Sequence, residues 1–194
     1  MRLTAMSVSE LLAAFRSSEP TPGGGSAAAL AGAAGASLLA MVAALPKPNA
    51  ATDEDLSLLQ AAGEKCTGLA LQLESLIDRD SAAYDGVVAA FRLPKTSDPE
   101  KGARTAAIQS ALKVATETPL EVMRRCADAL SAATVVEEKG NPNASSDVQV
   151  ARALLAAGLQ GGQANVAINL GSIKDADYVD RVRGEAERLA ATAV

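Results

Sequence analysis

The chain has 194 residues, of which 48% are hydrophobic and only 2% aromatic, and its formal net charge is −5 with no long basic run. We therefore expect residues 1–194 to form a single domain with no nucleic-acid partner. The chain contains no histidine, which excludes histidine-dependent triads, histidine-ligated zinc and an imidazole base, so acid–base chemistry falls to carboxylates, lysine or tyrosine.

Alanine supplies most of the apolar residues, so strands built from bulky β-branched and aromatic side chains are not expected. The composition favours an all-α fold, a bundle of about six helices with long central helices. Small side chains bury little apolar area per residue, so we expect further burial against a second copy and predict a homodimer.

The first predicted helix covers residues 7–17 and ends before Pro20. Four apolar residues share one side of it: Val8, Leu11, Leu12 and Phe15. The run Pro20-Thr21-Pro22-Gly23-Gly24-Gly25-Ser26 follows as a rigid turn with flexible backbone after it, and a second helix begins there. Gly32 and Gly35 of that helix are places where another backbone could pack closely.

The second helix is predicted to continue to about Leu45, where Pro46 and Pro48 stop it. The stretch from Ala27 to Leu45 carries no charge and is long enough to span a membrane. Most of it is Ala and Gly, which add little transfer free energy, and it lacks the usual flanking basic anchors. We interpret it as a buried central helix and expect no membrane partner.

A long third helix is predicted from a capped, acid-first start at Thr52 to Phe91. Steps of three and four residues trace a regular seam along it: Leu56, Leu59, Gly63, Cys66, Ala70, Leu73, Ile77, Asp80, Tyr84, Val87 and Phe91. Asp80 is the member that does not suit a core.

An ionised carboxylate among apolar residues is costly unless it is paired, and burial would raise its pKa toward the range useful for proton transfer. Asp80 is therefore a candidate acid/base, and Tyr84, one turn later, could donate a hydrogen bond to it. Two alternatives stay open: an ion pair with an arginine of a neighbouring helix, or a rotated seam that exposes Asp80.

The second half of the chain predicts three more helices. The fourth covers residues 98–140 with Asp98 as its N-cap, and Pro119 should kink or restart it. A polar connector over residues 141–147 leads into a fifth helix that ends near Leu170, and a final helix spans about 175–193.

The glycine run at a helix start offers unpaired backbone N–H groups and the positive end of a helix dipole to an anion or a polar ligand group. It lacks the lysine of a phosphate loop, so nucleotide binding has little support. The alternative is a turn that allows close helix packing.

Three further polar features are candidates. Asn165 and Asn169 share one face of the fifth helix, which indicates polar recognition or, alternatively, an interhelical hydrogen bond. Asp147 closes the polar connector and either serves the site or complements a helix N-terminus. Lys95, taken alone, reads as a solvated surface lysine.

Cys66 and Cys126 fall inside helical patterns among apolar neighbours, and we interpret both as buried thiols. The first residues lack the basic and apolar regions of a secretory signal, so a cytoplasmic location is expected.

These features occur in an order that resembles the cyclodeaminase/cyclohydrolase family over nearly the whole chain. The proline-framed triple glycine is quite specific, and the ordered set is more specific than any one part. The segments that carry the resemblance are Pro20-Thr21-Pro22-Gly23-Gly24-Gly25-Ser26, Asp80 with Ala83-Tyr84, Leu93-Pro94-Lys95, Pro119-Leu120, Asn143-Ala144 with Ser146-Asp147, Asn165-Val166 through Asn169-Leu170, and Lys174-Asp175.

The resemblance implies an all-helical dimer that acts on a tetrahydrofolate derivative as substrate, with no permanently bound cofactor and no metal. The favoured activity is that of a methenyltetrahydrofolate cyclohydrolase, which adds water to the methenyl bridge to give 10-formyltetrahydrofolate. The alternatives are a formimidoyltetrahydrofolate cyclodeaminase, which expels ammonia as the ring closes, and a non-catalytic helical dimerisation or folate-binding module.

The same resemblance suggests roles for the candidate residues. We hypothesise that Asp80 is the general acid/base, assisted by Lys95 and Asp147 in proton transfer or water placement. The chain departs from the family at Leu45-Pro46-Lys47-Pro48, a loop that could reshape the cleft. The residues expected to position the pterin and linker are Thr21, Pro22, Gly23, Gly24, Gly25, Ser26, Tyr84, Asn143, Asn165 and Asn169.

Overall fold

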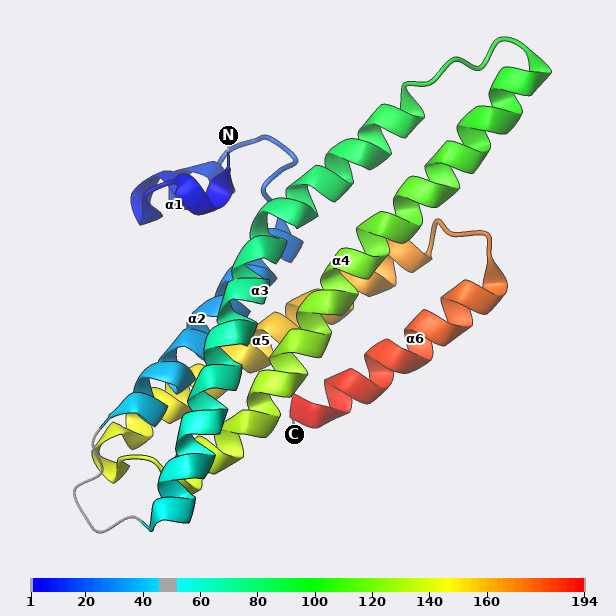
Figure 1. The fold of residues 1–194 in the computed structure, drawn as a ribbon. Coiled ribbons are helices and arrows are strands. Elements are labelled where there is room, and N and C mark those ends of the chain that lie inside the picture. Colours follow the sequence, from blue (N-terminus) through cyan, green and yellow to red (C-terminus); the bar gives the residue numbers. More distant parts are fainter. Residues whose placement is uncertain (1, 46–51, 194) are drawn as a thin grey trace.

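The computed structural model describes residues 2–45 and 52–193, and this part of the chain contains helices and no strand (Figure 1). Three short 3-10 segments are Leu3–Ala5, Pro142–Ala144 and Ala191–Ala193. The predicted all-α bundle of about six helices is confirmed. Pro46 and Pro48, which were predicted to stop the second helix, lie outside the described residues. The α-helices are α1 (Val8–Phe15), α2 (Gly24–Ala44), α3 (Asp53–Phe91), α4 (Asp98–Lys139), α5 (Ser145–Leu170) and α6 (Ala176–Ala190).

Side-chain caps fix where three of these helices begin. Ser7, Thr52 and Ser97 each accept a hydrogen bond from the backbone N–H three residues on, and the acid at that position bonds back to the cap. The predicted start at Thr52 is confirmed. Asp98 as the N-cap of α4 is wrong, because the Ser97 hydroxyl takes that place and leaves Asp98 in the first turn, where its charge suits the helix dipole.

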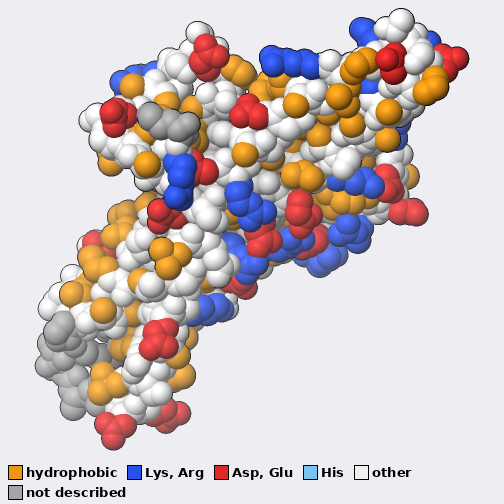
Figure 2. Space-filling model, turned by 45° about the horizontal axis from the view of Figure 1, so that its top comes forward, with side chains coloured by type: hydrophobic (Ala, Val, Ile, Leu, Met, Phe, Trp, Pro, Cys, Tyr) orange, Lys and Arg blue, Asp and Glu red, His pale blue; other side chains and the backbone are white. Residues whose placement is uncertain are grey.

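The two longest helices, α3 and α4, form an antiparallel hairpin, and α2 and α5 lie along part of it (Figure 1). α2 packs against α3 and α5, and α4 packs against α3 and α5. α6 joins α4 through an ion pair in which Arg124 Nε lies 2.6 Å from Glu185 Oε1. The far end of the hairpin projects past the other helices and exposes hydrophobic side chains, among them Phe91 and Leu93 (Figure 2).

Small residues let three helices meet around one thiol. A Cβ added to Gly32 of α2 would lie 2.7 Å from Cys126 Sγ of α4, and one added to Gly158 of α5 would lie 2.8 Å from the same sulfur. At Gly35 the added atom would lie 2.8 Å from the Ala151 carbonyl oxygen. The close approach predicted at Gly32 and Gly35 is therefore confirmed. Burial raises the pKa of Cys126 to about 12, as expected for a buried thiol.

Among the described residues, α2 is the one helix long and apolar enough to cross a membrane, a property it shares with core helices of soluble proteins. It lies within the bundle against α3, α4 and α5. Only 44% of its most apolar stretch is buried, so α2 is less enclosed than the predicted central helix.

Pro119 lies inside α4, which runs without interruption from Asp98 to Lys139. Of the two predicted outcomes, a kink or a restart, the restart is therefore wrong. Proline has no N–H and leaves the carbonyl four residues earlier, that of Ala115, without its helical partner. The Asn169 side chain of α5 supplies the missing donor, with Nδ2 2.9 Å from the Ala115 oxygen. A side chain from the neighbouring helix thus completes the helical hydrogen bonding.

Two expected apolar faces are only partly buried. On α1, Leu11 is buried whereas Val8 and Leu12 are exposed. Only a narrow part of this short helix therefore packs against the bundle. Along α3 the seam is buried at Leu59, Cys66, Leu73 and Ile77 but exposed at Leu56 and Phe91. The ends of α3 extend beyond the helices that cover its middle, which explains the difference.

The glycine contacts around Cys126 predict opposite effects for two Gly→Ala substitutions. Gly158→Ala should lower the free energy of unfolding by about 1–3 kcal/mol, the usual cost of overpacking a tight interior. Gly68→Ala, where nothing lies within 4 Å of the added Cβ, should raise it by about 0.5–1 kcal/mol because alanine favours the helix. Urea unfolding of both variants checks this, and equal effects would contradict the packing described.

Candidate active site

A cavity of about 390 Å³ opens where the glycine-rich bend meets the middle of the bundle. The bend and the start of α2 form one wall, α3 a second, and α4 with α5 the rest. It is lined by Pro20, Thr21, Gly23, Gly24, Gly25, Asp80, Tyr84, Val87, Leu112, Ala115, Asn165, Ile168, Asn169 and Ser172. The structure thus brings the glycine bend, Asp80 and both asparagines to one place.

The Asp80 carboxylate lies directly against Gly25. A Cβ added to Gly25 would stand 2.5 Å from Asp80 Cγ and 2.7 Å from Oδ2, far inside van der Waals contact. The next residue, Ser26, is fully buried and donates from Oγ toward Asp80 Oδ2 at 3.1 Å. Only glycine at position 25 leaves room for this carboxylate, so the bend both shapes the cavity and accommodates the acid.

The environment of Asp80 favours its protonated form. Burial raises the pKa of the carboxyl, and hydrogen bonds from the Ser26 hydroxyl and backbone N–H oppose the rise without cancelling it. Asp80 forms no ion pair with any residue that the structure describes, so the alternative of an arginine partner is not supported. The other alternative, a seam rotated into solvent, is also excluded because the side chain faces the cavity wall.

The two asparagines hold the α5 wall of the cavity in different ways. Asn165 Nδ2 donates to the Gly161 carbonyl of its own helix at 2.8 Å. The same side chain lies close to Gly24, where an added Cβ would stand 3.4 Å from Nδ2. Asn169 Nδ2 is used by the Ala115 carbonyl, so the predicted interhelical hydrogen bond is present. Their amide oxygens are the groups available to a ligand. Tyr84 is 42% exposed at the rim and has no hydrogen bond to Asp80 among those of the described chain.

Five residues assigned to the site do not line this cavity, and one of them, Ser26, is fully buried against Asp80. Asp147 is eighteen residues before Asn165 on α5, about 27 Å along the helix axis, and Asn143 precedes it at the same end of the bundle. Lys95 is exposed in the loop beyond α3, which runs about 16 Å further from Asp80 to its end. Pro22 faces a neighbouring cavity. Within one chain, Lys95 and Asp147 lie far from the cavity that Asp80 lines.

The apolar wall was missed by sequence reasoning. Leu112, Ile168 and Ser172 line the cavity together with Val87, which was assigned only to the seam of α3. Ile168, which precedes Asn169 in the sequence, is a large aliphatic residue with 74% of its surface exposed. No signal in the sequence identifies these residues, because their place depends on how α4 and α5 are rotated.

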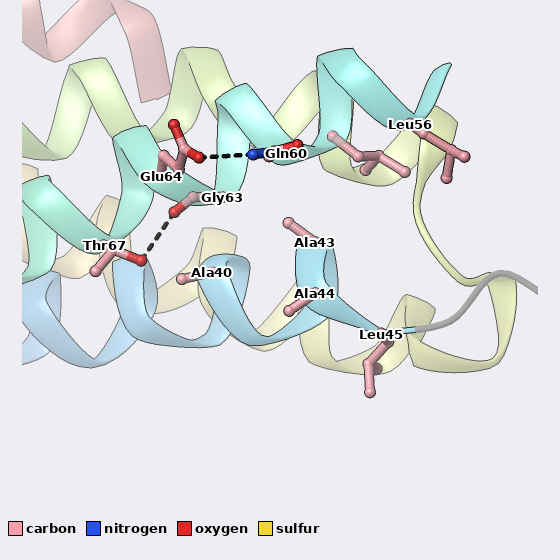
Figure 3. Close-up of a pocket in the computed structure, with 10 residues that line it drawn as sticks. Ala40, Ala43, Ala44, Leu45, Leu56, Gln60, Gly63, Glu64 and Thr67 are labelled. Carbon is pink, nitrogen blue, oxygen red and sulfur yellow. Dashed lines mark hydrogen bonds between the residues drawn. The ribbon is translucent and has the colours of Figure 1, made fainter. Parts of the chain in front are cut away.

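A second hollow of about 440 Å³ lies between the end of α2 and the start of α3, and it is mainly apolar (Figure 3). Its polar side chains are already engaged: Gln60 Nε2 donates to Glu64 Oε1 at 2.9 Å, and Thr67 Oγ1 donates to the Gly63 carbonyl at 2.9 Å. This groove therefore offers apolar surface rather than catalytic groups. Among the described residues, no cluster of three or more His, Cys, Asp or Glu side chains could hold a metal ion.

Burial of Asp80 predicts a stability gain when its charge is removed. The folded-state pKa is raised above the ordinary 3.8, so the ionised carboxylate destabilises the fold increasingly as the pH rises through that folded pKa. Asp80→Asn should be more stable than the wild type at pH 7, and the difference should shrink as the pH falls toward 3.8. Thermal unfolding from pH 4 to 8 measures this, with Asp85→Asn on the exposed side of α3 as control. A variant less stable at pH 7 would contradict it.

Known proteins share this sequence and fold. The family model for formiminotransferase-cyclodeaminase matches residues 7–188. A methenyltetrahydrofolate cyclohydrolase from Methylorubrum extorquens is 41% identical, covering 96% of this chain and 89% of the relative. A formimidoyltransferase-cyclodeaminase from Rattus norvegicus is 33% identical over 84% of this chain, which spans only 30% of that relative. The crystal structure of a formiminotetrahydrofolate cyclodeaminase from Thermotoga maritima matches with a TM-score of 0.87 and 28% identity, covering 99% of this chain and 92% of that one. The chain therefore belongs to the formiminotransferase-cyclodeaminase family, as its ordered motifs predicted.

Proposed function

We propose that this protein is a methenyltetrahydrofolate cyclohydrolase, which adds water to 5,10-methenyltetrahydrofolate to give 10-formyltetrahydrofolate. The observation that carries the proposal is Asp80, a half-buried carboxylate without a cationic partner in the described chain, at the wall of a cavity lined by amides and apolar side chains. Similarity to the Methylorubrum cyclohydrolase over nearly the whole of both chains supports this activity over others in the family.

Hydration of the methenyl bridge needs a base and then an acid. Asp80 in its ionised form takes a proton from water as the oxygen bonds to the cationic bridge carbon. Asp80 then gives that proton to N5 as the bond between N5 and the tetrahedral carbon breaks. The hydroxyl proton of this carbon passes to the Asp80 carboxylate, which leaves a formyl group on N10 and one proton on Asp80 to be released. The reaction releases one proton overall. Burial raises the pKa of this carboxyl, which makes the same group a better proton acceptor in the first step while it can still donate in the second.

The cavity has groups suited to the substrate ring. The amide oxygens of Asn165 and Asn169 can accept hydrogen bonds from a pterin edge, and Leu112, Val87 and Ile168 offer apolar surface to its faces. Its volume of about 390 Å³ lies in the range of small-molecule sites. The tetrahydrofolate derivative enters as substrate, with no cofactor held permanently, and Tyr84 stands at the rim where the linker would leave.

A second candidate is formimidoyltetrahydrofolate cyclodeaminase activity, favoured by the structural match to the Thermotoga enzyme. There N10 attacks the formimino carbon, the bond to the nitrogen that leaves as ammonia breaks, and an acid protonates that nitrogen. Asp80 could supply this proton from the same place. The two reactions are separated by offering each substrate and following methenyl absorbance, which falls in hydrolysis and rises in deamination.

Asp80→Asn should lower kcat by about 10²–10⁴-fold for whichever substrate is used, the usual contribution of a positioned acid or base. Lys95→Met and Asp147→Asn should keep the wild-type rate, because both residues lie far from the cavity within a chain. Turnover followed by methenyl absorbance checks all three. An active Asp80→Asn variant would overturn the proposed role, and folate binding without turnover in the wild type would favour a non-catalytic module. A large loss in Asp147→Asn would show that the site is not built from one chain.

We also propose that the protein acts as a cytoplasmic homodimer, with residues 1–194 as one domain. The free cysteines suit a reducing compartment. For the dimer, the face formed by α2 and α3 is the favoured interface because it carries two adjoining apolar hollows of about 440 and 420 Å³. Met41 of α2 is exposed, and so is Leu71 of α3, which lines the smaller hollow. Exposed apolar area of this kind is typical of an interaction surface.

Leu71→Glu should convert the dimer into a monomer, because a charge on the α2–α3 face would be buried without a partner. Val150→Glu places the same charge on an exposed valine of α5, outside this face, and should leave the dimer intact. Sedimentation equilibrium at several concentrations measures the change. A wild-type protein that stays monomeric, or a dimer that both variants keep, would refute the proposed interface.

A further inference from the structure

The hydroxyl of Ser26 is the meeting point of three polar groups inside the bundle. Ser26 Oγ lies 3.1 Å from Asp80 Oδ2, 3.3 Å from Ser81 Oγ and 2.9 Å from the Ile77 carbonyl oxygen. Ser26 has no exposed surface, so its hydroxyl exchanges protons only with these neighbours. Asp80 and Ser81 are consecutive in α3, and the Ser26 hydroxyl lies within hydrogen-bond distance of both side chains.

Ser81 opens onto a different cavity from Asp80. That outer cavity, of about 630 Å³, lies between the N-terminal segment, the bend and α3, and Ser81 is one of its lining residues. Thr21 lines both cavities, so the bend is the wall between them. The charged side chains on the outer cavity are Arg2, Glu19, Asp78 and Asp85.

The proposed reaction needs a path for a proton that does not pass through the substrate. Hydration of the methenyl cation releases one proton per turnover, and a folate in the active-site cavity covers the side of Asp80 that faces it. We propose that Ser26 and Ser81 form a proton relay that connects Asp80 with water in the outer cavity. This inference rests on the proposed function and on Asp80 as its acid/base.

The relay moves one proton from Asp80 to the outer cavity in three coupled transfers. Protonated Asp80 gives its proton to Ser26 Oγ as the Ser26 hydroxyl proton moves to Ser81 Oγ, and the Ser81 proton moves to water in the outer cavity. The three oxygens end with the protons they began with, Asp80 is ionised again, and one hydronium leaves. The reverse sequence reloads Asp80.

The contact with the Ile77 carbonyl does not block this path. In the helical pattern of α3, that carbonyl already accepts the backbone N–H of Ser81, four residues later. When the Ser26 hydroxyl turns from Ile77 toward Ser81, no buried acceptor loses its only partner. The hydroxyl is therefore free to alternate between its neighbours.

Ser81→Ala tests the relay while leaving every group of the active-site cavity in place. We expect kcat to fall by about tenfold or more, in the lower range of acid–base effects, with KM unchanged. Ser81→Thr keeps a hydroxyl and should retain most of the rate. Ser75→Ala is the matched control, because Ser75 is on the same helix and its hydroxyl bonds only to the Gln72 carbonyl, at 2.7 Å.

Imidazole buffer and deuterium oxide distinguish a relay from a structural role. Added imidazole should restore the rate of Ser81→Ala in proportion to its concentration and leave the wild type unaffected. The dependence of kcat on the deuterium fraction should be curved in the wild type, where several protons move together, and linear in Ser81→Ala.

The Ser81 and Asp80 variants distinguish a failure of the relay from a failure of the proposed activity. Wild-type kcat in Ser81→Ala, or an equal loss in Ser81→Thr with no response to imidazole, overturns the relay while an inactive Asp80→Asn upholds the function. A wild-type protein that turns over neither folate overturns both.

Discussion

The contact between the Asp80 carboxylate and the backbone at Gly25 is the constraint on which the site depends. A half-buried acid without a cation is stabilised when its oxygens are hydrogen-bonded, and Ser26 supplies such a bond from the first turn of α2. The missing Cβ of Gly25 gives the carboxylate its space. The acid and the bend must therefore be in register, which fixes α2 against α3 at this level of the bundle.

That register is maintained by small residues further along α2. Gly32 and Gly158 approach Cys126 from two helices, so α2, α4 and α5 meet at van der Waals distance one or two turns from the cavity. Packing of this density leaves little freedom to slide one helix past another. An alanine-rich interior thus gives a rigid frame for a site made of loop backbone and helix side chains, and it leaves apolar hollows on the outer face of α2 and α3.

Much of this could be predicted from the sequence. The helix starts at Thr52 and Ser7 follow from local capping, and Asp80 was found because a carboxylate interrupts an apolar seam. Leu112 and Ile168 could not be placed, since the rotation of α4 and α5 about their axes is set by packing between helices. Asp147 and Lys95 were grouped with Asp80 through family resemblance, although the rise of an α-helix already separates Asp147 from Asn165 by most of the length of α5.

Pro119 and Asn169 act as one unit although they belong to different helices. The proline leaves the Ala115 carbonyl without its helical donor, and the Asn169 side chain of α5 donates a hydrogen bond to it. This bond links α4 and α5 at the wall of the cavity. Replacing the proline with a residue that has an N–H would return the carbonyl to the helical hydrogen bonding of α4 and release the Asn169 side chain. The gap in the α4 backbone thus sets the orientation of the Asn169 amide at the cavity wall.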